Sequence, residues 1–295
     1  MHIPVFFHST IIMTSDHIVY LTSSGNLDIF PNNNPGRFIN RLSNPIILDN
    51  NINYEVGLIS ILYPDQYYGI LAGVDSFDME VSTQQKGKKD ADRLTIQLKQ
   101  HILAGNLENT VKIVNDTLMQ MMEAHYHGIF HALFPKDEKI LKWNDVEKRV
   151  EISRKGEHPS VKLPHYIEKI SVEFKQRLAP ILGFRKKALY TIYDINQPRE
   201  IYQSPLPPSP KCGVDYIYMY ADIIQPSNFG GQLVNILDCF TLQNGGNKGI
   251  HNSVYKTLNT SFIDQISIDI RDQKGRRIYF LDDSTLTCAL HIRPK

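Results

Sequence analysis

Alternation of apolar and polar residues marks both ends of the chain. Three such runs lie between residues 18 and 64, and Gly, Pro or Asn residues bound each of them; they read IVYLTSS, FINRLSNPIIL and YEVGLISILYP. Alternation with a period of two is typical of strands that bury one face. The first quarter of the chain therefore predicts three successive strands.

The C-terminal third repeats this pattern more regularly, in DYIYMYADII, DQISIDIRD and TLTCALHIRPK. The side chains expected on the buried faces are Ile217, Met219, Ala221, Ile223, Ile266, Ile268, Ile270, Leu286, Cys288, Leu290 and Ile292. Those expected on the exposed faces include Tyr216, Tyr218, Tyr220, Asp222, Thr287, Ala289, His291 and Arg293. Strands with one buried and one solvent-exposed face are typical of antiparallel sheets packed in a sandwich.

The strand count then indicates the fold class. Two further runs, LVNILDCFTL and the weaker HNSVYKTL, raise the total from the two ends to roughly eight strands. Eight antiparallel strands in two sheets is the number found in jelly rolls. We expect a mainly β protein, with a single jelly-roll β-sandwich of two antiparallel four-stranded sheets.

The middle of the chain has a different texture, and we interpret residues 73–211 as an α+β insertion domain. FDMEVST and RLTIQLKQ flank a polar turn and predict a hairpin. SPLPPSPK at 204–211 contains four prolines, which predict an extended return connector. The jelly-roll domain would then be discontinuous, comprising residues 1–72 and 212–295.

One main helix is expected within the insertion, over NTVKIVNDTLMQMMEAHYH, with Asn106 or Asn109 as its N-cap. GIFHALF, KILKW and KRVEISR, which follow it, have the character of strands. ISVEFKQRLAPILGF begins as a strand and should end as a short helix closed by Gly183.

The composition of the chain limits the classes of partner that it is expected to bind. The 295 residues carry a formal net charge of +1, so no global field directs the chain to nucleic acid or to an anionic membrane. The N-terminal stretch lacks a basic region and a long apolar run, which predicts neither a signal peptide nor a membrane span. The three cysteines, Cys212, Cys239 and Cys288, are widely spaced and are expected to be reduced thiols.

The strongest signal for metal chemistry is EAHYHGIFH, which contains Glu123, His125, His127 and His131. A His-x-His pair on a strand is how cupins begin a metal site, but the glutamate that should follow is replaced by His131. We therefore expect solvated histidines near a turn, and no catalytic residue, metal site or cofactor. The basic stretches QQKGKKDADR and GFRKKALY are expected to be solvated loops, with a contact to DNA as the alternative.

Several separated motifs resemble one protein family. The run YLTSSGNLDIFPNNNPGRFINRLSNPIIL leads into YEVGLISILYP, and LAPILGF, DYIYMYADIIQPSNFGGQLVNIL and IDQISIDIRDQKGRRIYFLDDSTLTCALHIRPK follow in the same order. Together they are similar to the penton, or minor capsid, proteins of virophages and related Polinton-Maverick-type viruses. Two positions depart from the family pattern: Tyr54 stands where the family has tryptophan, and Ile292 stands where it has phenylalanine.

The resemblance implies a structural protein and not an enzyme. It implies a homopentamer at the five-fold vertices of an icosahedral capsid of a double-stranded DNA virus, in contact with double-jelly-roll capsomers of the major capsid protein. Assembly would take place in the host cytoplasm, without a membrane and with no main role in nucleic acid binding. Tyr216, Tyr218, Tyr220 and Arg293 are the candidate interface residues.

Alternatives remain for these surfaces. The tyrosine row is equally typical of an ordinary exposed strand face, and Arg293 of a solvated terminus. A carbohydrate- or receptor-binding jelly roll is the alternative function, because this fold also occurs in lectins.

Overall fold

The computed structural model describes residues 16–85, 88–134, 138–155, 167–175, 177–241, 247–249 and 253–295. The chain divides into two compact units. Unit 1 comprises residues 1–67 and 214–295, and unit 2 comprises residues 68–213. The sequence-based boundaries of the insertion, 73 and 211, lie five residues after and two residues before these positions.

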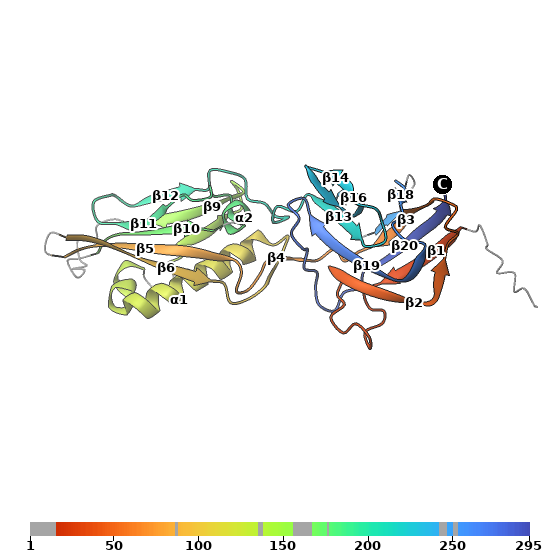
Figure 1. Ribbon diagram of the computed structural model, residues 1–295. Helices are drawn as coiled ribbons and strands as arrows, with labels where there is room; N and C mark the ends of the chain where they lie inside the picture. The colour runs from red at the N-terminus through yellow and green to blue at the C-terminus, as the bar shows by residue number, and fades with distance from the viewer. Residues whose placement is uncertain are drawn as a thin grey trace, which may run out of the picture. The chain divides into compact units, whose positions relative to one another are not determined.

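Unit 1 is a jelly-roll β-sandwich of two antiparallel sheets (Figure 1). One sheet has the order β1-β20-β3, with β17 and β18 both paired to the far edge of β3; the other has the order β16-β13-β19-β2. The strands span His17–Thr22 (β1), Arg37–Ile47 (β2), Tyr54–Leu62 (β3), Tyr216–Ala221 (β13), Ile236–Thr241 (β16), Asn247–Gly249 (β17), Lys256–Thr257 (β18), Phe262–Asp272 (β19) and Thr287–Pro294 (β20).

The pairing in unit 1 is nested, as in a hairpin that has been rolled up. The first strand pairs with the last (β1 with β20), the second with the next to last (β2 with β19), β3 with β17 and β18, and β13 with β16. This nesting is the topology of a jelly roll. The described residues therefore confirm the mainly β fold class and the jelly-roll sandwich with an insertion.

The core of unit 1 lies between the two sheets, and the alternation in the sequence correctly predicts it. Every residue expected on a buried face is at most a few per cent exposed; these are Ile217, Met219, Ala221, Ile223, Ile266, Ile268, Ile270, Leu286, Cys288, Leu290 and Ile292. Ala289 is buried as well, although alternation places it outward. The register between β20 and β3 shifts between Ala289 and Leu290, and this irregularity interrupts the alternation.

The asparagine-rich loop before β2 is held by its own side chains. Asn33 donates to the carbonyl oxygens of Gly25 and Ile39 and accepts from the Ile39 amide, with N···O distances of 2.9–3.0 Å. Gly36 lies so close to the backbone that a Cβ atom there would be 2.3 Å from the Ile278 carbonyl oxygen. The loop thus needs a glycine at 36 and amide side chains around it.

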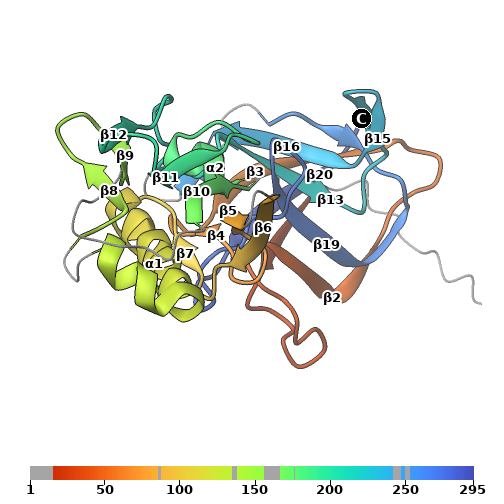
Figure 2. The same cartoon turned by 90° about the vertical axis from the view of Figure 1, so that its left-hand side faces the viewer.

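Unit 2 combines two main sheets with one long helix (Figure 2). One sheet has the order β11-β10-β5-β6, the other β12-β9-β8, and a short pair joins β4 and β7. The elements span Tyr68–Ile70 (β4), Ser76–Gln85 (β5), Lys88–Gln97 (β6), Ile102–Leu103 (β7), Leu107–Leu133 (α1), Leu141–Asn144 (β8), Arg149–Arg154 (β9), Ile167–Phe174 (β10), Leu178–Leu182 (α2), Tyr190–Asp194 (β11) and Glu200–Gln203 (β12).

Helix α1 is longer than the sequence predicts. Asn106 accepts from the Asn109 amide at 2.9 Å and is the N-cap, as expected. The helix continues through residues 127–133, so the expectation of a strand at GIFHALF is wrong. A non-helical residue, Tyr126 (φ −134°, ψ 36°), marks a kink where the first helical segment was expected to end.

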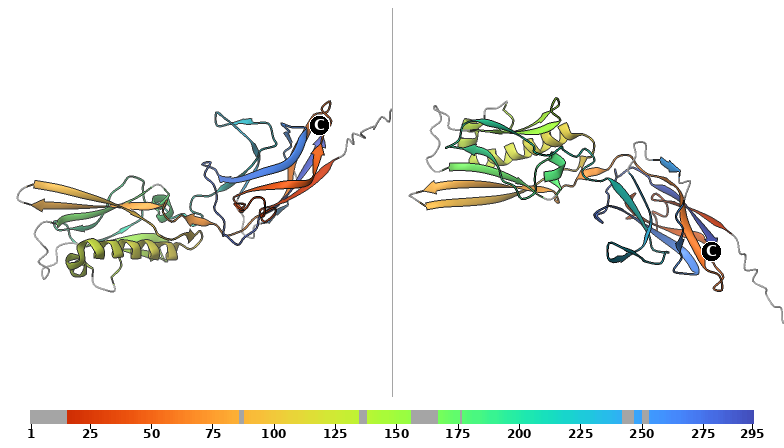
Figure 3. Two further views of the ribbon diagram at one scale, coloured as in Figure 1. Left: turned by 60° about the horizontal axis from the view of Figure 1, so that its bottom comes forward. Right: turned by 90° about the horizontal axis from the view of Figure 1, so that it is seen from above.

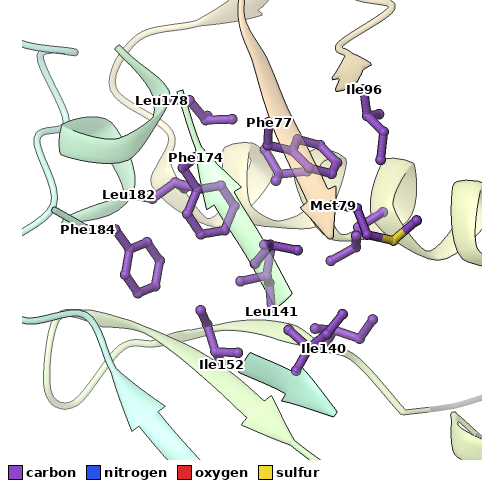
Figure 4. Packing of buried hydrophobic residues seen from close by; sticks show 14 of the residues in the cluster. Phe77, Met79, Ile96, Ile140, Leu141, Ile152, Phe174, Leu178, Leu182 and Phe184 are labelled. Atoms are coloured by element: carbon purple, nitrogen blue, oxygen red, sulfur yellow. The ribbon is translucent and has the colours of Figure 1, made fainter. Parts of the chain in front are cut away.

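The core of unit 2 is built from both sheets and from the apolar face of α1. Helix α1 runs along one face of strands β5, β6 and β10 (Figure 3). Figure 4 shows Phe174 between Phe77 and Phe184. The rings of Phe174 and Phe184 stack with centroids 5.0 Å apart. Burial of several aromatic rings supplies unit 2 with a hydrophobic core of its own.

The end of α2 determines where the return connector lies. Gly183 adopts the left-handed conformation (φ 81°), and a Cβ there would be 2.3 Å from the Leu206 carbonyl oxygen. Hydrogen bonds from Leu206 N to Gly183 O and from Ser209 N to Ile181 O attach the proline-rich segment to α2. Gly183 therefore serves both as the expected helix stop and as the site of close packing.

No helix among the described residues combines the length and apolar character that a membrane span requires.

Candidate functional site

The outer face of the β16-β13-β19-β2 sheet carries the predicted tyrosine row. Tyr216, Tyr218 and Tyr220 alternate along β13 with the buried Ile217 and Met219. Tyr216 is 47 % exposed, whereas the other two are half-buried. The structure thus brings the three tyrosines to one surface, as their spacing predicts.

Neighbouring elements half-cover two of these rings. Phe229 packs edge-on against Tyr218 with ring centroids 5.4 Å apart. The guanidinium of Arg271 lies 5.1 Å from the centre of the Tyr220 ring. Partial burial is the main cause of the raised pKa of the Tyr218 hydroxyl, and the adjacent Cys239 thiol adds to it. The Tyr218 phenol therefore stays neutral and remains available as a donor and an acceptor.

Arg271 is itself positioned by a carboxylate. Its Nη2 lies 2.8 Å from Oδ2 of Asp269, two residues earlier on β19. This hydrogen bond is the main cause of the raised pKa of Arg271, although burial acts in the opposite direction. The pair orients the guanidinium over Tyr220, so the surface presents aromatic rings edged by an oriented cation.

A short hairpin extends the aromatic surface. Strands β14 (Ser227–Phe229) and β15 (Gln232–Val234) pair across Gly230 and Gly231, which both have positive φ. Its side chains Phe229 and Leu233 are 49 % and 75 % exposed. The hairpin was not predicted, although two consecutive glycines between short polar and apolar runs are a hairpin signal. Leu233 pairs with Asn228 and Phe229 with Gln232, so Leu233 and Phe229 lie on opposite faces of the hairpin. We refer to Tyr216, Tyr218, Tyr220 and Phe229 as the aromatic surface.

Arg293 lies on the outer face of the other sheet of unit 1, but it is not free. Its Nη2 and Nε lie 2.7 and 2.8 Å from Oε1 of Glu55, its cross-strand partner on β3. The guanidinium stacks over the Tyr255 ring at 3.6 Å, and the Tyr255 hydroxyl is 2.8 Å from Nδ1 of His291. Arg293 is thus bound within its own chain, but its side chain is 42 % exposed, and its contact with a neighbouring subunit stays a prediction.

Among the described residues no group of three potential metal ligands is found. His125 lies on α1 and contacts the ring of Tyr126, at a centroid distance of 6.3 Å. The side chains of His127 and His131 lie outside the described part of the structure. Cys239 is exposed, whereas burial raises the pKa of the Cys212 and Cys288 thiols to about 12.

The chain is similar to a number of solved structures. A search of solved structures finds the crystal structure of the selenomethionine-labelled mavirus penton protein, with a TM-score of 0.47 and 12 % sequence identity. The alignment covers 95 % of this chain and 100 % of that one. No protein-family model matches the chain, and no curated protein matches it.

Proposed function

We propose that the chain is a structural capsid protein of the penton type, which forms a homopentamer at the five-fold vertices of an icosahedral virus particle. In this proposal it contacts the surrounding major capsid capsomers and resides in the virion after assembly in the host cytoplasm. It performs no catalysis. The work of such a protein is done by its surfaces, repeated around a symmetry axis.

The carrying observation is that the penton-like sequence motifs, except LAPILGF, coincide with jelly-roll strands of unit 1. The N-terminal motif covers the end of β1 and all of β2 and β3, the middle motif covers β13, and the C-terminal motif covers β19 and β20. LAPILGF forms α2 and its Gly183 stop in unit 2. The other segments are far apart in the sequence, yet the nested pairing assembles them in one sandwich, which supports the resemblance.

The aromatic surface supports a role in assembly. Exposed Tyr and Phe side chains bury much area on association while the phenol hydroxyls keep hydrogen-bonding capacity. A cyclic pentamer uses a heterologous interface, in which this surface would contact a different patch on the neighbouring copy. We propose that the aromatic surface forms one half of that interface.

The proposal is tested first by the oligomeric state and by particle assembly. Size-exclusion chromatography with light scattering is expected to show a pentamer, or a monomer that pentamerises with capsomers. Co-expression with the major capsid protein is expected to give particles whose vertices are filled in electron micrographs. Equally stable, closed particles formed without this chain would rule out the penton role.

A matched pair of variants tests the surface. Tyr216→Glu together with Phe229→Asp places two charges on the aromatic surface and is expected to prevent pentamer formation without unfolding the monomer, since both side chains are about half exposed. Tyr20→Glu is the control, since Tyr20 is 74 % exposed on the edge strand β1 of the opposite sheet. Loss of assembly in the control alone would assign the interface to the other sheet.

A further inference from the structure

A groove of about 470 Å³ lies in unit 2 between the first turns of α1 and strand β8. The buried side chains Val111 and Leu141 provide its apolar lining, and both belong to the core of the unit. The volume lies within the range that is usual for small-molecule sites. Because its walls come from a helix and a strand fixed on one core, the groove is preformed.

The side chains that line this groove carry an excess of positive charge. Lys112, Lys139 and Lys142 line it, all three are exposed, and none forms an ion pair among the described residues. Several other cations of unit 2 are paired, such as Arg154 with Glu200 at 2.6 Å. Against three ammonium groups the groove lining contributes one carboxylate, that of Glu108. The site therefore favours an anionic ligand.

An aromatic side chain completes the groove. Trp143, the single tryptophan of the chain, lines it, is half-buried and packs against the core of unit 2. Its contact with the core leaves part of the ring at the groove, beside lysines without an ion pair among the described residues. An aromatic ring beside such cations can take a flat ligand with an apolar face.

We propose that this groove binds an acidic polysaccharide whose pyranose rings carry separate carboxylate groups. The apolar face of one sugar ring packs on Trp143, and the carboxylates are bound by Lys112, Lys139 and Lys142. The exposed Asn109 amide and the Glu108 carboxylate bond sugar hydroxyls. This activity needs neither pentamers nor a capsid, so it is independent of the proposed structural role.

The composition of the groove favours a sugar acid over a nucleic acid. Strands of nucleic acid present a phosphate at every nucleotide, and Arg forks and several stacked aromatic rings usually recognise them. This groove has one aromatic ring, no arginine in its lining, and a carboxylate that would repel a continuous row of phosphates. Glu108 is instead well suited to accept hydrogen bonds from hydroxyl groups.

The test uses the full chain and three probes: an alginate hexasaccharide, neutral maltohexaose and a thymidine hexanucleotide. Because Trp143 is the only tryptophan, its fluorescence reports occupancy directly, and calorimetry provides the affinities. We expect alginate to bind and to shift the emission, and maltohexaose to bind at least about tenfold more weakly. Added salt should weaken alginate binding.

Variants separate the groove from general surface charge. The double change Lys112→Gln and Lys142→Gln is expected to weaken alginate binding about tenfold or more. Trp143→Phe keeps an aromatic ring in the core and should cost less than Trp143→Ala, with circular dichroism checking that both are folded. Lys186→Gln, an exposed lysine of unit 2 outside the groove, is the control and should bind as the parent does.

Three outcomes would overturn the proposal: no binding of alginate, equal binding of maltohexaose, or tighter binding of the oligonucleotide that depends on the same lysines. The last result would make the groove a site for single-stranded nucleic acid. None of them bears on the capsid proposal, which is tested by oligomeric state and vertex occupancy.

Discussion

The two units build their cores in opposite ways. In unit 1 the buried side chains come from strands at the two ends of the chain, and Leu21 of β1 lies opposite Cys288 of β20. In unit 2 a single continuous segment, residues 68–213, provides the helix and both sheets around Phe174. The first unit therefore depends on long-range pairing, whereas the second can complete its core from neighbouring parts of the sequence.

Buried ion pairs occur in both units but join different parts of the chain. In unit 1 Asp272, whose side chain is 4 % exposed, pairs with Arg276 four residues later, at the turn after β19. In unit 2 Asp78 and Asp75, which are equally buried, are held by cations from distant segments: Asp78 by Arg93 and Lys175, and Asp75 by Arg177. Acid should therefore weaken a local contact in unit 1 but contacts between separate elements in unit 2.

The largest effect is expected from Leu290→Asp in unit 1. Leu290 is 0 % exposed, so the substitution buries a carboxylate without a partner and should cost several kcal/mol. Little folded unit 1 should remain by amide exchange, whereas the fluorescence of Trp143 in unit 2 should stay native. Leu290→Met, which conserves volume, is the control. Loss of both signals in Leu290→Asp would show that unit 2 requires the sandwich.

The converse change is Phe174→Ala, in the core of unit 2. Removing a ring that packs between Phe77 and Phe184 should cost about 3–5 kcal/mol, since it leaves a cavity. Denaturant unfolding followed by Trp143 fluorescence measures it. Phe262→Ala, at an exposed position of unit 1, should change stability by only about 0.5 kcal/mol or less. A similar loss in both variants would contradict the core assignment.

A smaller and pH-dependent effect is expected for Asp78→Asn. Burial raises the pKa of Asp78, but hydrogen bonds from Lys175, Thr95 and Arg93 outweigh it and hold the pKa below its usual value. Because the folded-state pKa is lowered, the stabilisation is complete above the ordinary Asp pKa of about 4. It is lost as the pH falls through the lowered value.

The variant should therefore lose about 2 kcal/mol at neutral pH and progressively less in acid. The measurement is the difference in unfolding free energy between parent and variant as a function of pH, with Trp143 as the probe. Glu147→Gln, at an exposed position, should show no such difference. A difference that stays constant from neutral pH into strong acid would exclude the charge of Asp78 as its source.

A still smaller effect is expected for Arg293→Glu, which places a carboxylate beside Glu55. The variant should fold with a lower melting temperature, more so at low salt, because the two charges repel and the stack on Tyr255 is lost. The exchanged pair, Glu55→Arg with Arg293→Glu, should restore stability. Unchanged stability together with empty vertices would instead assign Arg293 to a contact with another capsid protein.

The smallest effect on the stability of the sandwich is expected from removal of unit 2. We propose that it is an inserted unit, since the strand pairs of the sandwich contain no residue from 68–213. Replacing residues 68–213 by a short Gly/Ser linker should leave a soluble β protein whose sandwich melts close to the parent temperature. An unfolded product, detected by circular dichroism, would show that the insertion supplies part of the sandwich.

Local patterns predict much of this fold because each strand of the sandwich buries one face only. The alternation in β13, β19 and β20 identifies nearly every core side chain, and Asn106 and Gly183 correctly mark helix ends. A turn residue or an alternation with a period of two determines local structure within a few residues. Such a signal can therefore be recognised without knowing which strand or helix packs against the segment.

The sequence predicts less where contacts between distant parts of the chain determine the local structure. GIFHALF has apolar and aromatic residues that suit a strand, yet it continues α1 beyond the kink at Tyr126. The sequence also gives no sign that Arg293 is paired within its own chain, because Glu55 and Tyr255 are brought to it only by the fold. The groove at Trp143 likewise combines the start of α1 with β8, which no local pattern joins.

Strand β20 lies between β1 and β3 in its sheet, although it is the last of these three to be synthesised. During synthesis on the ribosome, the edges of β1 and β3 that pair with β20 stay unpaired until residues 287–294 have emerged. By then all residues of unit 2 have already been synthesised. Exposed strand edges invite pairing with other chains. The nested topology thus makes the nascent sandwich vulnerable to aggregation until synthesis reaches β20, and the insertion lengthens that interval by the time needed to translate it.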